Sequence, residues 1–131
     1  MAQTARPLSP HLQVYRWQVQ MVTSILHRAT GIALAVGTLV LVLGLAALAR
    51  GPEAWSAFAT CAASPLGRFA LFGWSWALSY HLLNGLRHLA QDGGWGYDIP
   101  RFVASSWTSV VGSLVLTAAI WACVLMRGGA A

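Results

Sequence analysis

Three long apolar segments dominate this sequence and leave few folds open to it. They run over residues 22–48, 66–89 and 103–126, and each has the roughly 20 residues that a helix needs to cross the hydrocarbon of a bilayer. The connectors between them are rich in glycine, proline and polar residues, which favour turns. The sequence therefore predicts an all-α fold with three transmembrane helices.

Composition agrees with a chain embedded in lipid. Hydrophobic residues make up 57% of the sequence and charged residues 8%, whereas a soluble domain usually carries about 25% charged residues. The arginines stand singly near the ends of the apolar segments, unlike the clustered basic face of a nucleic-acid-binding protein. Cys61 and Cys123 belong to no CxxC or Cys/His pattern, so we interpret them as small packing residues.

We divide the chain into a cytoplasmic N-terminal segment, residues 1–21, and a transmembrane anchor domain, residues 22–131. The first is polar, contains two prolines and lacks a signal-peptide pattern. The connector from Arg50 to Pro65 is long enough for a short surface turn of helix. Three spans place the termini on opposite sides, and the arginines then divide unequally between Arg6, Arg16, Arg28, Arg87 and Arg101 on one side and Arg50, Arg68 and Arg127 on the other. The positive-inside rule therefore predicts a cytoplasmic N-terminus.

A first polar motif lies near the start of the first apolar segment. Four residues share one helix face because they are spaced i, i+3, i+4 and i+7: Ser24, His27, Arg28 and Gly31. A hydroxyl, an imidazole and a guanidinium on one face offer donors to a polar ligand at the membrane edge, and the glycine lets a helix or flat cofactor approach. In the alternative interpretation, Arg28 only reaches the lipid headgroups and His27 packs between helices.

A second motif lies in the second apolar segment. His81 is about 12 Å inside the end of that segment, and it shares a face with Asn84, Gly85 and His88. No Cys, Asp or Glu lies at its depth, which argues against zinc, whereas a lone imidazole with a glycine one turn away suits a haem axial ligand. Arg87 and His88, nearer the surface, could meet the haem propionates. The alternative is a core histidine bonded to a neighbouring backbone.

The expected topology brings the two motifs to the same side of the membrane. The first segment enters where the second leaves, so residues 24–28 lie at about the depth of Arg87 and His88. The chain has no second deep histidine for the other axial position. A partner subunit is therefore implied, and the chain is expected to form part of a multi-subunit membrane helix bundle.

Both motifs carry a resemblance to a known family. Residues 6–15 together with 24–31, and the pattern His-x3-Gly-x-Arg-His-x3-Asp from His81 to Asp92, resemble the signatures of the succinate dehydrogenase cytochrome b subunit, the larger membrane anchor of respiratory complex II. The resemblance covers nearly the whole chain, from Arg6 through the third apolar segment. Gln91 departs from it, because the family often has tryptophan before the aspartate.

The resemblance implies a set of partners and cofactors. A second small membrane anchor subunit would share haem b, and an iron–sulfur subunit and a flavoprotein subunit would bind on the cytoplasmic face of a bacterial inner membrane. Electrons from succinate would pass through FAD and iron–sulfur clusters to ubiquinone. The chain would thus be a subunit of succinate dehydrogenase whose dehydrogenase chemistry resides on partner chains.

The resemblance also assigns roles to residues. His81 would be the haem axial ligand, hence the ligand of the haem iron, and Ser24 and Arg28 would belong to the quinone site. His27 and Arg28 would lie at or near a haem propionate. Three other functions remain open: the cytochrome b anchor of a fumarate reductase-type complex, a purely structural membrane anchor, and a small transporter or proton channel. The last is disfavoured because no carboxylate lies within the apolar segments.

Overall fold

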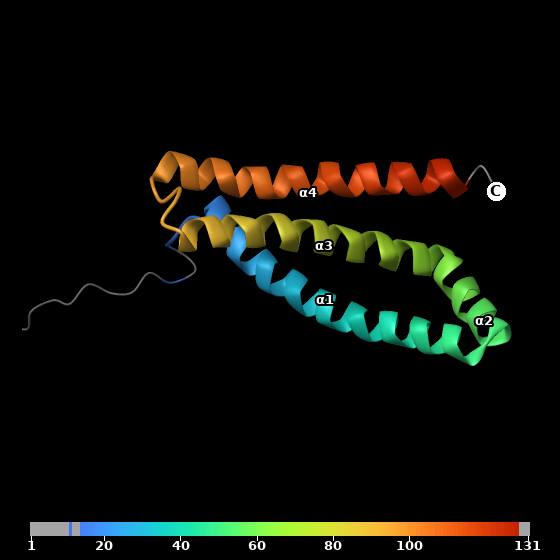
Figure 1. Ribbon diagram of the computed structural model, residues 1–131. Helices are drawn as coiled ribbons and strands as arrows, with labels where there is room; N and C mark the ends of the chain where they lie inside the picture. The colour runs from blue at the N-terminus through green and yellow to red at the C-terminus, as the bar shows by residue number, and fades with distance from the viewer. Residues whose placement is uncertain (1–10, 12–13, 129–131) are drawn as a thin grey trace, which may run out of the picture.

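The computed structural model describes residue 11 and residues 14–128, and every regular element in that part of the chain is an α-helix. The helices are α1 (Val19–Arg50), α2 (Pro52–Ala63), α3 (Pro65–Asp92) and α4 (Ile99–Gly128). In Figure 1, α3 lies between α1 and α4, and α4 runs alongside it for its whole length, whereas α1 diverges from α3 toward the end closed by α2. The predicted all-α fold is confirmed. Most of residues 6–15, the first part of the signature that resembles the family, lies outside the described residues.

Local sequence explains where the first three helices begin and end. Gly51 has a φ of 116°, a conformation that suits glycine, and it separates α1 from α2. Pro52 and Pro65 occupy the first positions of α2 and α3, where their missing N–H costs no hydrogen bond. The Ser64 hydroxyl accepts a hydrogen bond from the Gly67 N–H at 3.1 Å and so caps α3. The connector over residues 50–65 thus holds a 12-residue helix, which is longer than the short turn expected from sequence.

Two of the long helices meet the length and hydropathy requirements of a membrane span among the described residues. These are α1 and α4, which contain 18-residue windows with mean hydropathies of 2.6 and 2.2 respectively. α3 coincides with the second predicted apolar segment but is interrupted by His81, Asn84 and Arg87. Polar residues of this kind lower the hydropathy of α3 and mark it as the helix that carries a site.

The distribution of side chains is inverted relative to that of a soluble protein. Large hydrophobic side chains are exposed along all four helices, whereas Asn84 and the Tyr80 ring have 0% exposure. Most of the other buried side chains are small and carry hydroxyl groups: Thr23, Thr30, Ser79, Ser106, Ser109, Ser113 and Thr117. Small and polar residues between helices, with apolar residues outside, are the pattern expected when lipid is the solvent.

The seam between α3 and α4 is closely packed. Ser106, Ser113 and Thr117 lie along the buried face of α4, and each hydroxyl donates to a backbone carbonyl of α4 itself, as Ser113 does to Val110 at 2.7 Å. A Cβ added at Gly112 would lie 3.1 Å from Leu83 of α3. The two helices therefore approach closely because the residues between them are small and need no partner.

Candidate functional site

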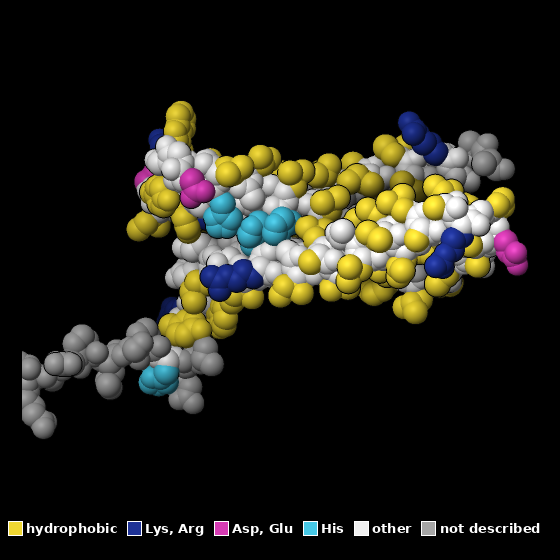
Figure 2. Space-filling model, turned by 60° about the horizontal axis from the view of Figure 1, so that its bottom comes forward, with side chains coloured by type: hydrophobic (Ala, Val, Ile, Leu, Met, Phe, Trp, Pro, Cys, Tyr) yellow, Lys and Arg dark blue, Asp and Glu magenta, His cyan; other side chains and the backbone are white. Residues whose placement is uncertain are grey.

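Three imidazoles gather where α1 meets α3. The rings of His27 and His81 are stacked, with centroids 3.9 Å apart and planes 8° apart, and the His88 ring lies 5.1 Å from that of His27. Figure 2 shows histidine side chains together on one face, toward the end that carries the α3–α4 connection. The structure therefore brings together the predicted histidines of both sequence motifs.

A glycine on each helix makes room for the histidine of the other. A Cβ added at Gly31 of α1 would lie 3.2 Å from Cε1 of His81, and one added at Gly85 of α3 would lie 3.8 Å from Cε1 of His27. Each glycine follows the histidine of its own helix by one turn. The two helices thus use the same His-x3-Gly spacing, and the absence of side chains at both glycines allows the imidazoles to stack.

The His81 ring is held through one of its nitrogens. Nδ1 lies 3.2 Å from the backbone oxygen of His27 and 3.3 Å from the hydroxyl oxygen of Thr30. The Thr30 hydroxyl is itself within donating distance of the Leu26 carbonyl, at 2.8 Å. A proton on Nδ1 that is donated to these oxygens leaves Nε2 with a free lone pair. Metal-ligating histidines are commonly oriented in this way.

The residues around His81 fit a haem. The His27 Nδ1 atom is buried and has no hydrogen-bond partner among the described residues, so a carboxylate such as a haem propionate would satisfy it. Within the same part of the chain, no three His, Cys, Asp or Glu side chains are arranged to hold a bare metal ion. One imidazole nitrogen without a partner among the described residues suits an axial ligand whose counterpart comes from another chain.

Asn84 links His88 to Arg87. Its Nδ2 donates to Nε2 of His88 at 3.1 Å, and its Oδ1 accepts from Nη1 of Arg87 at 3.3 Å. Arg87 also donates through Nε to Ser105 of α4 at 3.0 Å and stacks over the Phe102 ring at 4.5 Å. Arg87 is thus directed toward α4, while His88 is directed toward His27. One donor of Arg87, Nη2, is buried without a partner among the described residues.

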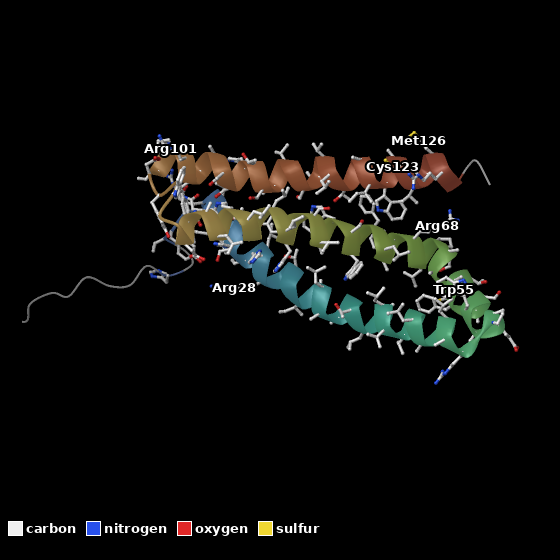
Figure 3. The ribbon with its side chains drawn as sticks, viewed as in Figure 1. Arg28, Trp55, Arg68, Arg101, Cys123 and Met126 are labelled. Carbon is white, nitrogen blue, oxygen red and sulfur yellow. The ribbon has the colours of Figure 1, made fainter. Side chains whose placement is uncertain are left out.

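Ser24 and Arg28 lie at the edge of the packed surface of α1. Thr23 and Thr30 are the buried residues of this face, whereas Ser24 is half-buried and Arg28 is exposed. In Figure 3, Arg28 is on the side of α1 that faces away from α3 and α4. Gln20, one turn before Ser24, has a buried side-chain oxygen without a partner in the described chain. Arg28 therefore points outward from this edge of α1, whereas the Gln20 oxygen is enclosed within the chain.

Sequence reasoning did not single out Tyr80, which ties α3 to α1. Its hydroxyl donates to the backbone oxygen of Thr23 at 2.9 Å, and its ring is fully buried. Tyr80 and His81 thus bond to carbonyls one turn apart on α1. A tyrosine directly before the histidine was visible in the sequence, but a backbone acceptor has no sequence signal. Gln91, also buried, lies at the end of α3 and is remote from His81 in sequence.

Comparison with known proteins agrees with this arrangement. The model of the succinate dehydrogenase/fumarate reductase transmembrane subunit family matches residues 2–120. The chain is 46% identical over 111 residues to the succinate dehydrogenase cytochrome b556 subunit of Paracoccus denitrificans, covering 85% of each chain. It is 39% identical to the subunit of that name from Rickettsia felis, covering 88% of this chain and 90% of the relative. It is 43% identical to the mitochondrial cytochrome b560 subunit of Sus scrofa, covering 76% and 60% respectively.

Proposed function

The chain belongs to the succinate dehydrogenase/fumarate reductase transmembrane subunit family, and we propose that it is the cytochrome b anchor of a succinate:ubiquinone oxidoreductase. In that complex it anchors the soluble subunits, binds haem b together with a partner anchor, and forms part of the site of ubiquinone reduction. The observation that carries the proposal is the orientation of His81, whose Nδ1 is bonded to α1 and whose Nε2 is left free. The names of the relatives, all cytochrome b subunits of succinate dehydrogenase, agree with it.

The remaining parts of the complex belong to other chains. A second small membrane anchor supplies the other haem ligand, and an iron–sulfur subunit and a flavoprotein subunit carry the clusters, the FAD and the oxidation of succinate. α1, α3 and α4 correspond to three spans, at about 22–48, 66–89 and 103–126, in a bacterial cytoplasmic membrane. Residues 1–21 then lie on the cytoplasmic side, and the excess of arginine on that side supports this orientation.

A bound haem would supply a one-electron centre. His81 would hold its iron through Nε2, while the carbonyl of His27 and the hydroxyl of Thr30 keep the imidazole ring in place. His27 and His88 are available for the propionates, since His27 Nδ1 is buried without a partner in the described chain. Arg87 contributes its charge and one free donor, Nη2, from the α4 side. Asn84 keeps the proton of His88 on Nδ1 by donating to Nε2.

Ser24 and Arg28 act on the ubiquinone head. The Ser24 hydroxyl donates a hydrogen bond to one carbonyl oxygen of the ring. Arg28 offsets the negative charge that develops on the quinone oxygens as electrons arrive, before two protons complete the ubiquinol, and such an interaction is strong in a site that excludes water. The half-buried and exposed positions of these two residues support the role, because the head then binds between this chain and its partners.

The proposed function is tested by purifying, in mild detergent, the complex that accompanies this tagged chain and measuring succinate-driven reduction of ubiquinone. We expect activity that quinone-site inhibitors suppress, together with a b-type haem spectrum. Two rival functions give different results in the same preparation. A purely structural anchor gives succinate oxidation without haem, and a fumarate reductase-type complex reduces fumarate with a quinol faster than it oxidises succinate. A preparation that contains no soluble subunits and no succinate activity would overturn the proposal.

A further inference from the structure

A cavity lies between α2, α3 and α4, at the end of the bundle opposite the histidines. Its volume is about 630 Å³, which lies within the range of pockets that hold small molecules, roughly 300–1,000 Å³. Its walls are almost entirely apolar, and they include Trp55 and Phe58 of α2, Leu71 of α3, and Trp121 and Leu125 of α4. An apolar cavity of this size accepts a hydrocarbon chain.

Arg68 is the only charged residue among the described residues that line this cavity. It is exposed, and in Figure 3 it lies between the start of α3 and the last part of α4. No acidic side chain pairs with it in the described chain, where the one ion pair joins Arg101 to Asp98 at the other end of the bundle. The cavity thus combines an apolar interior with an uncompensated guanidinium at its edge.

Helix energetics do not account for a cation at this position. Arg50 and Arg127 lie in the last turns of α1 and α4, where the helix dipole favours positive charge. Arg68 comes three residues after Pro65, at the beginning of α3, where the dipole favours negative charge instead. The exposed guanidinium of Arg68 therefore calls for an anionic partner from outside the chain.

The two tryptophans place the cavity at the depth of lipid headgroups. Indole rings concentrate at the boundary between hydrocarbon and water, and both rings line the cavity together with Arg68. The Trp121 ring is fixed, because its Nε1 donates to the Ser75 hydroxyl at 2.9 Å and it packs against the Phe72 ring in a T-shaped arrangement. The wall of the cavity is thus rigid on the side of α3 and α4.

We propose that this cavity binds one acyl chain of an anionic phospholipid whose phosphate group pairs with Arg68. The apolar walls match the chain, the free guanidinium matches the phosphate, and basic pockets between transmembrane helices bind anionic headgroups for the same reason. A helix of a partner protein is the other conceivable occupant, but an apolar helix would leave the charge of Arg68 unpaired. The inference is independent of the haem and quinone site, which lies at the opposite end.

The test is native mass spectrometry of the intact, detergent-purified complex containing this chain, titrated with phosphatidylglycerol or with phosphatidylcholine. We expect the wild type to retain phosphatidylglycerol in preference to phosphatidylcholine. Arg68→Gln should weaken binding of phosphatidylglycerol about fivefold, since one arginine near the surface contributes about that factor. Arg50→Gln is the matched control, because Arg50 is exposed at the same end but does not line the cavity.

A second variant tests the hydrocarbon part of the site. Ala59→Phe keeps Arg68 and fills the cavity from α2, so it should also release the phospholipid, while an unchanged haem spectrum shows that the other end of the bundle is intact. Equal retention of phosphatidylglycerol by the wild type, Arg68→Gln and Ala59→Phe would overturn the proposal. Equal binding of the two phospholipids by the wild type would also overturn the proposal. The same conclusion would follow if a protein segment protected the cavity residues from labelling in a complex free of lipid.

Discussion

α3 contacts its two long neighbours in different ways. Toward α4 it meets a row of small hydroxyl side chains that bond to their own helix, and Trp121 bonds across the seam to Ser75. Toward α1 it presents imidazoles and a buried tyrosine, and it bonds to backbone carbonyls of α1. Buried polar atoms without partners among the described residues include His27 Nδ1 and Gln20 Oε1 of α1, whereas toward α4 they include Nη2 of Arg87.

The α3–α4 contact therefore serves mainly to hold the chain together, whereas the α1–α3 face carries the functional residues. A buried polar group that lacks a hydrogen bond costs roughly 1–3 kcal/mol, and the buried hydroxyls of α4 avoid this cost because they donate to carbonyls of their own helix. The α1–α3 face bears such costs, and the exposed Arg28 adjoins it. We infer that a cofactor, a quinone and a partner anchor satisfy these groups when the complex assembles.

The largest expected effect comes from a substitution on the α1–α3 face, which we call the open face because Arg28 beside it is exposed. Arg28→Leu should lower the rate of ubiquinone reduction by about 100-fold, the loss typical when a group that stabilises developing negative charge is removed. Haem content and assembly should not change, because the Arg28 side chain is exposed in this chain. Steady-state assays of the purified complex measure this. Arg101→Leu is the control, since Arg101 is exposed near the same end of the bundle. Wild-type turnover in Arg28→Leu would contradict the assigned role.

The next largest effect is expected from a substitution in the seam between α3 and α4. Ser113→Leu places a large side chain at a position with 0% exposure between α3 and α4, and overpacking of this kind typically costs about 1–3 kcal/mol. We expect a lower yield of assembled complex and a lower thermal denaturation midpoint. Ser113→Ala should differ little from the wild type, because the lost hydroxyl bonds only to its own helix. A Leu variant as stable as the Ala variant would show that the seam is looser than described.

A smaller effect is expected from a substitution of Asn84, which links His88 on the α1 side of α3 to Arg87 on the α4 side. Asn84→Leu removes the donor to His88 and the acceptor for Arg87, and each lost hydrogen bond contributes about 1 kcal/mol. His88 then loses its fixed orientation, so we predict a shift in the haem midpoint potential with little change in haem content. Redox titration of the b-type spectrum measures the shift. An unchanged potential would mean that His88 does not act on the haem.

The smallest effect should follow Thr30→Val. The valine keeps the shape of threonine but removes the oxygen that lies 3.3 Å from His81 Nδ1, while the carbonyl of His27 still accepts the proton. We expect a small shift in the haem spectrum or potential and no loss of haem. Thr38→Val, on an exposed face of the same helix, is the control. Equal spectra in both variants would assign the orientation of His81 to the carbonyl alone.

The sequence predicted the convergence of the two motifs because it depends only on topology. Helices that run in opposite directions across one bilayer place residues 24–28 at about the depth of Arg87 and His88, whatever the details of packing. The structure does bring the His88 ring to 5.1 Å from that of His27, but it stacks His27 on His81, which was expected about two turns deeper. The rotation of α1 about its axis could not be predicted in this way. The buried face of α1 carries the small hydroxyl residues Thr23 and Thr30, whereas the sequence reasoning emphasised the neighbouring Ser24 and Arg28.

The other features of the structure that were not predicted from the sequence have similar causes. The direction of Arg87 toward α4 depends on Ser105 and Phe102, which come from a segment with no signature of its own. The bond from Tyr80 to Thr23 uses a backbone acceptor, which any residue could provide. The length of α2 follows from an alanine-rich stretch that begins with proline at its first position, and this signal was present in the sequence but was interpreted as a short turn.

The central claim is that the open α1–α3 face holds a haem through His81, and one measurement tests it most directly. The reduced-minus-oxidised spectrum of the purified complex should show a b-type haem in the wild type and in His11→Leu, which changes an exposed imidazole outside the cluster. His81→Leu should lose or alter that spectrum while the complex still assembles through the α3–α4 seam. An unaltered spectrum in His81→Leu would contradict the account, because another residue would then ligate the iron.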